Sequence, residues 1–159
     1  MEKFKKGAVL ITGTTSGVGL NTLKPLIEFG WDIIAVNRSS KRAIDEANKI
    51  FNNNEIESIN FIEIDLSDLN SVRDGAKEIA TRFGNVLKVL ICNAAIYKPR
   101  LKRPERSSQG FENSMAVNHF GHFLLINLLL ESILNSDEKI ILNGEIFKFI
   151  PRITILGTV

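Results

Sequence analysis

The fold of this chain is decided by the stretch Val9-Leu10-Ile11-Thr12-Gly13-Thr14-Thr15-Ser16-Gly17-Val18-Gly19. An apolar run leads into a glycine-rich turn and then into a helical pattern, so the order strand, turn, helix is predicted. Gly13 permits a sharp turn, Gly17 lets the backbone approach a diphosphate, and Gly19 lets the helix pack closely on the sheet. Free N–H groups at such a helix start bind phosphates. The predicted dinucleotide contacts are Gly13, Thr14, Ser16, Gly17, Val18 and Gly19.

Length and composition indicate one globular domain over 1–159. The chain has 159 residues, of which 44% are hydrophobic and 24% charged, and its net charge is +2. This balance leaves no large field of one sign and indicates no nucleic-acid partner. Cys92 is the only cysteine, which excludes an internal disulfide and a four-cysteine metal site and fits a reducing, intracellular setting.

Strand and helix patterns alternate along the chain, which is typical of a parallel sheet with helices on both faces. Strands are expected over 9–11, 32–36, 59–64, 86–91 and 152–156. Helices are expected over 18–29, 41–51 and 111–134, and from a cap at Ser67 or Asp68 to Phe83. The Asn52-Asn53-Asn54 run is expected to end the second of these helices. The predicted fold is α/β, a Rossmann-type doubly wound parallel sheet that is incomplete at its C-terminal end.

Two segments fit this scheme less simply. The apolar run 120–134 contains polar residues and is shorter than the roughly 20 apolar residues of a membrane span, so we expect a core helix. Segment 139–150 has strand-like composition and no clear place in the sheet. A basic loop is expected over 96–108, between the fourth strand and the helix over 111–134.

The residues after the second predicted strand determine which dinucleotide the site prefers. An acidic residue there accepts from a ribose 2′-hydroxyl, whereas an arginine pairs with a 2′-phosphate. The strand ends in Asn37-Arg38, with Lys41 and Arg42 close behind. NADPH is therefore the predicted cofactor, with Arg38 and Lys41 as contacts, unless Arg38 is a solvated surface residue. Asp65, after the third strand, is expected to contact the adenine amino group, to cap the next helix, or to do both.

Several motifs together resemble the short-chain dehydrogenase/reductase family. Thr12-Gly13-x-x-x-Gly17-x-Gly19 matches the family's cofactor turn, and Asp65-Leu66 matches its adenine contact. Asn93-Ala94-Ala95 stands where the family carries an Asn-Asn-Ala-Gly-like run, with Cys92 and Ala95 as departures. Within the family, the light-dependent protochlorophyllide oxidoreductases are similar in stretches 92–99, 98–105, 110–112, 118–125 and 155–159. The resemblance covers nearly the whole chain and is weakest over 135–151.

This resemblance implies a light-driven transfer of hydride from NADPH to a ring double bond of protochlorophyllide, which yields chlorophyllide. It adds Leu66, Asn93, Ala94 and Ala95 to the expected cofactor contacts. It implies that Asn118 supports a proton relay by holding a water, and the alternative is an asparagine that satisfies backbone groups at a helix bend. It also implies that Thr158 orients the substrate, and the alternative is an ordinary strand-end threonine. Tyr97 is expected to line the pigment pocket.

The family's catalytic pair, Tyr-x-x-x-Lys, is missing from these 159 residues. Tyr97 does not fit the pair because Leu101 stands four residues after it. We therefore expect the amino-terminal portion of a longer enzyme, which binds NADPH weakly and does not turn over alone. The alternatives are a generic NADPH-dependent short-chain reductase of a small carbonyl and a non-catalytic NADP-binding module.

Metal binding, partners and location complete the expectations. His119 and His122 lie three residues apart without a suitably spaced third ligand, so packing roles and no metal are expected. The basic loop leaves open peripheral membrane contact, and the apolar helix leaves open a homo-oligomer. The short charged lead over 1–6 holds no signal or transit peptide. We expect a cyanobacterial-type cytoplasm, at a thylakoid surface or free, or a plastid where a presequence has been removed.

Overall fold

The computed structural model describes residues 6–98, 103–134, 139–142, 145–148 and 152–155. Its main sheet has five parallel strands in the order β3-β2-β1-β4-β7. These strands are β1 (Ala8–Thr12), β2 (Asp32–Asn37), β3 (Ile59–Glu63), β4 (Leu87–Cys92) and β7 (Arg152–Ile155). Successive strands are added on one side of β1 up to β3 and then on its other side from β4, so the strand order reverses between β1 and β4, as in a doubly wound fold. The predicted Rossmann-type sheet is confirmed.

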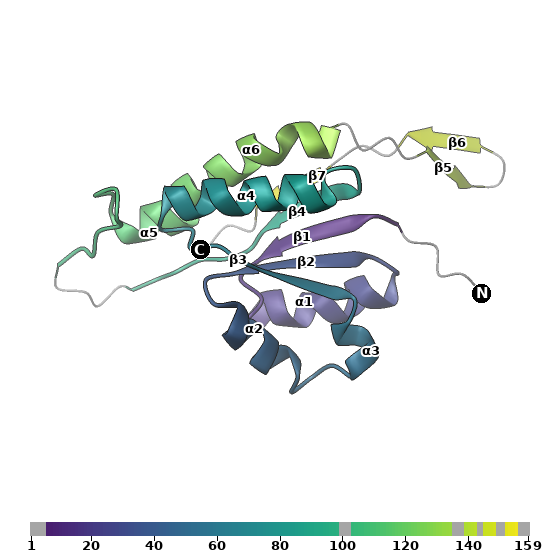
Figure 1. Cartoon of the computed structure of the whole chain (residues 1–159), viewed down its shortest axis with the longest axis horizontal. Helices are drawn as coiled ribbons and strands as arrows, with labels where there is room; N and C mark the ends of the chain where they lie inside the picture. The colour runs from purple at the N-terminus through teal and green to yellow at the C-terminus, as the bar shows by residue number, and fades with distance from the viewer. Residues whose placement is uncertain (1–5, 99–102, 135–138, 143–144, 149–151, 156–159) are drawn as a thin grey trace.

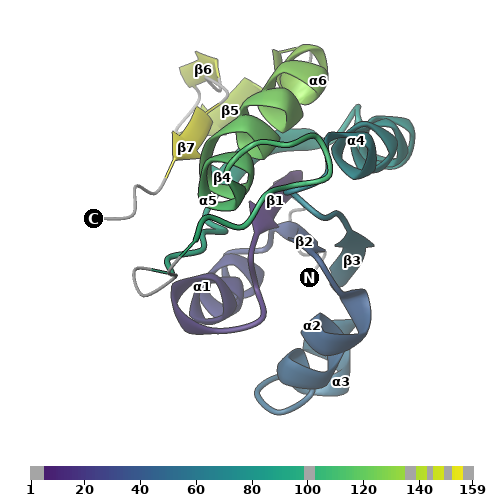
Figure 2. The same ribbon diagram turned by 90° about the vertical axis from the view of Figure 1, so that its left-hand side faces the viewer.

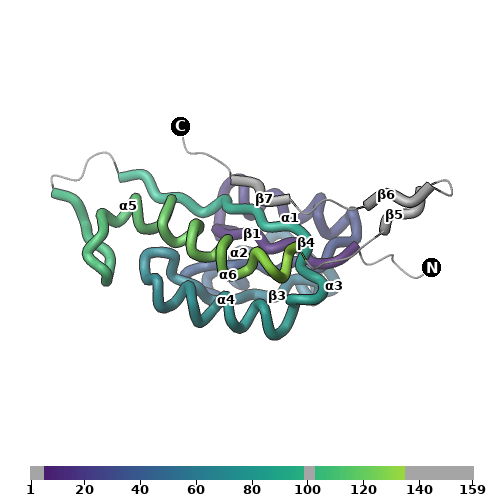
Figure 3. The backbone as a smooth tube through the Cα atoms, turned by 90° about the horizontal axis from the view of Figure 1, so that it is seen from above, coloured from purple at the N-terminus to yellow at the C-terminus, as the bar shows by residue number. Residues whose placement is uncertain are grey.

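Helices cover both faces of the sheet (Figures 1 and 2). One face carries α1 (Gly17–Glu28), α2 (Ser40–Ala47) and the short α3 (Asn53–Ile56). The other face carries α4 (Leu69–Phe83) and α6 (His122–Leu134), which lie side by side (Figure 3). A short α5 (Asn113–Met115) and a π-helical turn, η1 (Ala116–Gly121), lead directly into α6.

The core has two layers because successive strand residues point to opposite faces of the sheet. Leu10, Ile34 and Leu90 face α4 and α6 and pack with Leu125 and Leu129. The opposite layer packs against α1 and α2 and consists mainly of Val9, Ile11, Leu20, Leu23, Ile27, Ile33, Ala35 and Ala47. All five residues of β1 are buried, which is why its sequence reads as a continuous apolar run.

The helical segment Asn113–Leu134 is long and apolar enough to cross a membrane, with a mean hydropathy of 1.3 over 18 residues. One stripe of it, Leu125, Leu129 and Ile133, is at most 1% exposed and lies in the core beside α4 and β4. Residues on other faces, such as Phe123 and Leu134, are exposed. The packing of the stripe matches the core helix that the sequence predicts.

The expected end of the second helix was wrong. The helix expected over 41–51 ends at Ala47, and Asn52 begins α3 instead of ending α2. The Asn52 side chain accepts from the Glu55 N–H while the Glu55 carboxylate accepts from the Asn52 N–H, which is a capping box. The ambiguous segment forms an antiparallel pair, β5 (Lys139–Leu142) and β6 (Glu145–Lys148), separate from the main sheet (Figure 1).

Candidate functional site

A pocket of about 200 Å³ lies at the carboxyl ends of the central strands. Open α/β sheets bind ligands at this edge, where the strand order reverses and the loops after neighbouring strands diverge. The lining comes from the turn after β1, the ends of β2 and β3, the loop after β4, and η1. It consists of Gly13, Thr15, Val36, Asn37, Arg38, Ser39, Arg42, Ile64, Asp65, Leu66, Ala94, Ala95, Ile96 and Val117.

Each of the three glycines of the turn is required for a different structural reason. Gly13 has a φ of +74°, and a Cβ there would lie 2.7 Å from the Ala94 Cα. A Cβ on Gly19 would collide with the Gly13 carbonyl oxygen and the Asn93 amide, so α1 packs as closely as the motif predicts. Gly17 has a φ of +57° and faces open space. The turn is therefore tight on its protein side and open on the side of Gly17.

The start of α1 lacks a side-chain cap. Ser16 occupies the N-cap position in an extended conformation, and its hydroxyl accepts no N–H of the helix. Val18 is 67% exposed on the first turn. Since the first N–H groups of a helix need partners from outside it, this exposed helix start can accept an anion.

The turn after β1 is joined to the end of β2 by a buried pair. Asn37 Oδ1 accepts from the Thr14 backbone N–H at 2.7 Å, and Asn37 Nδ2 donates to the Thr14 hydroxyl at 2.7 Å. Thr14 is 1% and Asn37 is 4% exposed. In this structure Thr14 thus contacts Asn37 within the protein and does not line the pocket. Its predicted cofactor contact stays a prediction.

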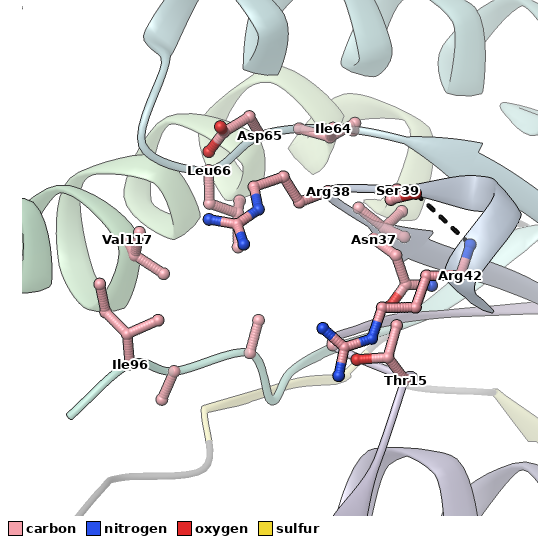
Figure 4. Close-up of a pocket in the computed structure, with 14 residues that line it drawn as sticks. Thr15, Asn37, Arg38, Ser39, Arg42, Ile64, Asp65, Leu66, Ile96 and Val117 are labelled. Atoms are coloured by element: carbon pink, nitrogen blue, oxygen red, sulfur yellow. Dashed lines mark hydrogen bonds between the residues drawn. The ribbon is translucent and has the colours of Figure 1, made fainter. Parts of the chain in front are cut away.

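Two arginines give the pocket its positive charge. Arg38 follows β2 and extends across the pocket near Leu66, while Arg42 comes from α2 and points toward Thr15 (Figure 4). The α2 helix begins after Ser39, whose hydroxyl accepts from the Arg42 backbone N–H at 3.4 Å. Lys41 is exposed and does not line the pocket. The structure therefore brings Arg42, which the predicted contacts left out, to the place expected for Lys41.

Asp65 and Leu66 lie on the pocket wall at the end of β3. Asp65 Oδ1 accepts from both the backbone N–H and the hydroxyl of Ser67, at 2.9 and 2.6 Å. This Asx turn leads into α4, whose N-cap is Asp68. Of the two expected roles for Asp65, helix capping belongs to Asp68, and the adenine contact is compatible with the position of Asp65 on the wall.

The loop after β4 is held by the end of β1. The Asn93 amide donates to the carbonyl oxygens of Thr12 and Gly13, at 2.8 and 2.9 Å. The Thr12 hydroxyl accepts from the backbone N–H groups of Asn93 and Ala94, at 3.0 and 2.9 Å. Asn93 therefore does not line the pocket itself. It holds the loop whose next two residues, Ala94 and Ala95, form part of the pocket wall.

Asn118 lies in the π-helical turn and fastens the next part of this loop. Its Oδ1 accepts from the Ile96 N–H at 2.9 Å, and its Nδ2 donates to the Ile96 carbonyl at 3.0 Å. Both polar atoms of the side chain are thus bonded to backbone, and Val117 is the η1 residue that lines the pocket. Single-turn π-helices are frequent at functional sites because they redirect one side chain. The predicted water-holding role of Asn118 stays a prediction.

The remaining predicted residues lie away from the pocket or outside the description. Tyr97 is 79% exposed and does not line the pocket. Thr158 lies outside the described residues. His122 is buried and faces Thr12, whereas the exposed His119 lies against the rings of Phe120 and Phe123. The two histidines thus have different surroundings, and no group of metal-ligating side chains occurs in the part of the chain that the structure describes.

Burial shifts two titratable groups near the site. It raises the pKa of the Cys92 thiol to about 12, so this side chain is a neutral apolar group of β4. Burial also lowers the pKa of His122, against a smaller opposite effect of the hydrogen bond with the Asn118 backbone. Neither group lines the pocket.

Known proteins match this chain in sequence over most of its length. Chloroplastic protochlorophyllide reductase of Daucus carota is 41% identical over 150 residues, which are 90% of this chain and 36% of that protein. The protein of the same name from Chlamydomonas reinhardtii is 39% identical over 136 residues, or 85% of this chain and 34% of that protein. The chain thus spans about a third of the length of these curated relatives.

Solved structures match the fold as well. An uncharacterized protein from Mycobacterium paratuberculosis is 33% identical, with a TM-score of 0.65 over 80% of this chain and 43% of that one. A 3-ketoacyl-(acyl-carrier-protein) reductase from Brucella melitensis, solved with NADH, has a TM-score of 0.60 at 23% identity over 79% of this chain and 49% of that one. The second likeness concerns the fold alone.

A family model decides the assignment. The short chain dehydrogenase model matches residues 7–143, which include the glycine turn, both arginines of the pocket and the Asn93 loop. Members of this family are oxidoreductases that use NAD(H) or NADP(H), in agreement with a pocket at the switch point of the sheet. This chain belongs to the short chain dehydrogenase family and is related to the protochlorophyllide reductases.

Proposed function

We propose that this chain is the NADPH-binding portion of a light-dependent protochlorophyllide reductase. The observation that carries the cofactor assignment is the pair Arg38 and Arg42 at one pocket. An arginine matches a phosphate in charge and in the geometry of its donors, whereas a free ribose hydroxyl calls for an acceptor. Asn37, which precedes Arg38, is bonded to Thr14 and offers no carboxylate.

The other residues of the site can be assigned in turn to the successive parts of a bound dinucleotide. The open side of Gly17 and the uncapped start of α1 suit the diphosphate. Arg38 and Arg42 hold the 2′-phosphate, and Leu66 and Asp65 border the adenine. Ala94, Ala95 and Ile96 then lie along the path toward the nicotinamide. When bound, NADPH supplies the hydride, and the protein orients it and excludes water.

The substrate assignment is supported by the relatives' name and by the motifs around residues 92–99 and 118–125. In this proposal the side chain of Asn118 keeps the wall at Ile96 in place beside the reacting ring. The proton that completes the reduction comes from the family's tyrosine of Tyr-x-x-x-Lys, a pair that 1–159 does not contain. We therefore expect this chain alone to bind NADPH without forming chlorophyllide.

A chimera tests this proposal. The segment of the carrot reductase that aligns with this chain is replaced by the chain itself, and the purified chimera is mixed with NADPH and protochlorophyllide. Chlorophyllide absorbance is expected after illumination and not in darkness. A folded chimera that binds NADPH but leaves the pigment unreduced in light would contradict the substrate assignment. Reduction of small carbonyls in darkness by the chain itself would favour a generic short-chain reductase instead.

A further inference from the structure

The Thr12 hydroxyl, at the carboxyl end of β1, has three close polar neighbours. The N–H groups of Asn93 and Ala94 point at it from 3.0 and 2.9 Å, and His122 Nε2 lies 2.9 Å away. A hydroxyl carries one proton and two lone pairs. Because backbone N–H groups only donate, Asn93 and Ala94 occupy both lone pairs. The hydroxyl proton is then left for His122.

This count determines the state of the imidazole. Nε2 of His122 must be an acceptor, so the ring proton is on Nδ1, which faces the Asn118 carbonyl oxygen at 3.5 Å. The ring is therefore neutral in its Nδ1–H form. Thr12 is fully buried and His122 is 4% exposed, so water does not compete for either group. Burial, which lowers the pKa of His122, agrees with a neutral ring.

We propose that His122 is a positioning residue of the cofactor site: its neutral Nδ1–H ring fixes the Thr12 hydroxyl so that this hydroxyl holds the Asn93–Ala94 loop. His122 does not line the pocket, but Ala94 does. The same loop touches the glycine turn. A Cβ placed on Gly13 would lie only 2.7 Å from the Ala94 Cα. The hydrogen bond of His122 thus contributes, together with the bonds of the Asn93 amide, to the spacing of two walls of the site.

A hydrogen-bonding role and a packing role of His122 differ in which side chains can replace its imidazole ring. An apolar side chain of similar size fills the volume but leaves the hydroxyl proton without an acceptor, so the hydroxyl is free to rotate. A glutamine places an amide oxygen near the position of Nε2 and can accept from Thr12. The effect of His122 on the Asn93–Ala94 loop does not depend on what the pocket binds, and only its effect on NADPH binding rests on the proposed function.

Nitrogen NMR of the chain tests the ring state directly, since the 159 residues contain only two histidines. A His119→Gln variant assigns the signals, because His119 is exposed and away from Thr12. We expect His122 Nε2 to show the shift of an unprotonated nitrogen and Nδ1 that of a protonated one. Free neutral histidine favours the opposite form, so the Nε2–H form at His122 would overturn the proposal.

Amide hydrogen exchange at Asn93 and Ala94 tests the consequence without any cofactor. His122→Leu is expected to speed exchange at these two amides at least about tenfold, the loss of one hydrogen bond's stabilisation, and His122→Gln to restore most of the protection. Unchanged exchange in a folded His122→Leu protein would overturn the proposal. If that variant does not fold, the ring state of His122 in the unaltered protein is decisive by itself. Failure to bind NADPH would count against the proposed function only.

Discussion

Asn37 holds Thr14 through both polar atoms of its amide, at 2.7 Å each, and so joins the end of β2 to the turn after β1. Both residues are buried, and Arg38 follows directly at the pocket. The position of the arginine relative to the glycine turn therefore depends on this pair. The Asn37 amide, which is bonded within the protein at the pocket wall, thus contributes to the geometry of the candidate site.

Asn37→Leu is expected to lower the free energy of unfolding by about 1–3 kcal/mol, because the buried N–H of Thr14 loses its acceptor. Urea denaturation measures the change. Asn127→Ala is the control, since the exposed Asn127 side chain bonds only its own helix at Phe123, and it should change stability by less than about 0.5 kcal/mol. Equal effects of the two substitutions would show that the Asn37–Thr14 pair contributes little.

Gly17→Ala is expected to weaken NADPH binding, while its cost in stability is only the cost of a left-handed residue, about 1–2 kcal/mol. Gly110→Ala is a matched control, because Gly110 also has a positive φ, +83°, and also faces open space. It lies in the loop before α5 and not in the glycine turn at the start of α1. Both proteins should lose similar stability by thermal denaturation. If the two variants bind NADPH equally well, Gly17 has no role at the diphosphate.

Gly19→Ala should be more damaging than Gly17→Ala, because its Cβ would meet backbone and not open space. Overpacking of this kind typically costs about 1–3 kcal/mol and here also moves α1 away from the Asn93 amide. Denaturation midpoints of the two variants, compared under the same conditions, check the order. If the Gly19→Ala protein were as stable as the Gly17→Ala protein, α1 could shift to accommodate the Cβ at no cost in free energy.

Stability should fall in mildly acidic solution because of His122. Its pKa is lower in the folded protein than in the unfolded chain, so the unfolded chain binds the proton first as the pH falls. The free energy of unfolding therefore decreases as the pH falls from about 6.5 toward the folded-state pKa, by at most about 1.4 kcal/mol per pH unit. His122→Gln should flatten this part of the curve. An unchanged curve in that variant would assign the effect to other groups.

Carboxylates act in a different pH range, which separates their effect from that of His122. Hydrogen bonds, chiefly from the Gln109 side chain, hold the pKa of Asp68 below its usual value, and those from the Ser114 and Met115 N–H groups do the same for Glu112. Both carboxyls therefore titrate below the ordinary range of carboxyl groups, which lies near pH 4. Denaturation curves between pH 5 and 7 therefore report on the histidine.

Cys92 should react slowly with thiol reagents. Burial raises its pKa to about 12, and the side chain is 1% exposed, so the thiolate is scarce and shielded at pH 8. Alkylation by iodoacetamide is expected to be at least about a hundredfold slower in the native protein than in urea, where the thiol is near its usual pKa. Mass spectrometry of timed samples measures both rates. Rapid native alkylation would contradict the buried position of β4's last residue.

The sheet and the glycine turn could be predicted because their signals are local. The apolar run of β1, the positive-φ glycines and the Asp68 cap each need only a few neighbouring residues. Asn52 misled because asparagine is favoured at both ends of helices, and the signal that marks a helix start here is the capping box with Glu55, three residues further on. Local patterns thus predicted element types better than element ends.

The choice between Lys41 and Arg42 could not be made from the sequence. Successive residues of a helix point about 100° apart, so a shift of one residue in the helix start changes which side chain faces the pocket. The bond between Ser39 and the Arg42 N–H fixes that start. Likewise, the contact between Thr12 and His122 joins residues 110 positions apart and leaves no local pattern.

The affinity of the chain for NADPH relative to NADH tests the central claim most directly. Titration calorimetry or cofactor fluorescence is applied to the unaltered chain, to Arg38→Ala and Arg42→Ala, and to Arg82→Ala as a control with the same loss of charge on α4. We predict tighter binding of NADPH than of NADH, with each pocket variant lowering NADPH affinity about tenfold and sparing NADH, and no change in Arg82→Ala. Equal affinity for the two cofactors, unaffected by Arg38→Ala or Arg42→Ala, would contradict the account.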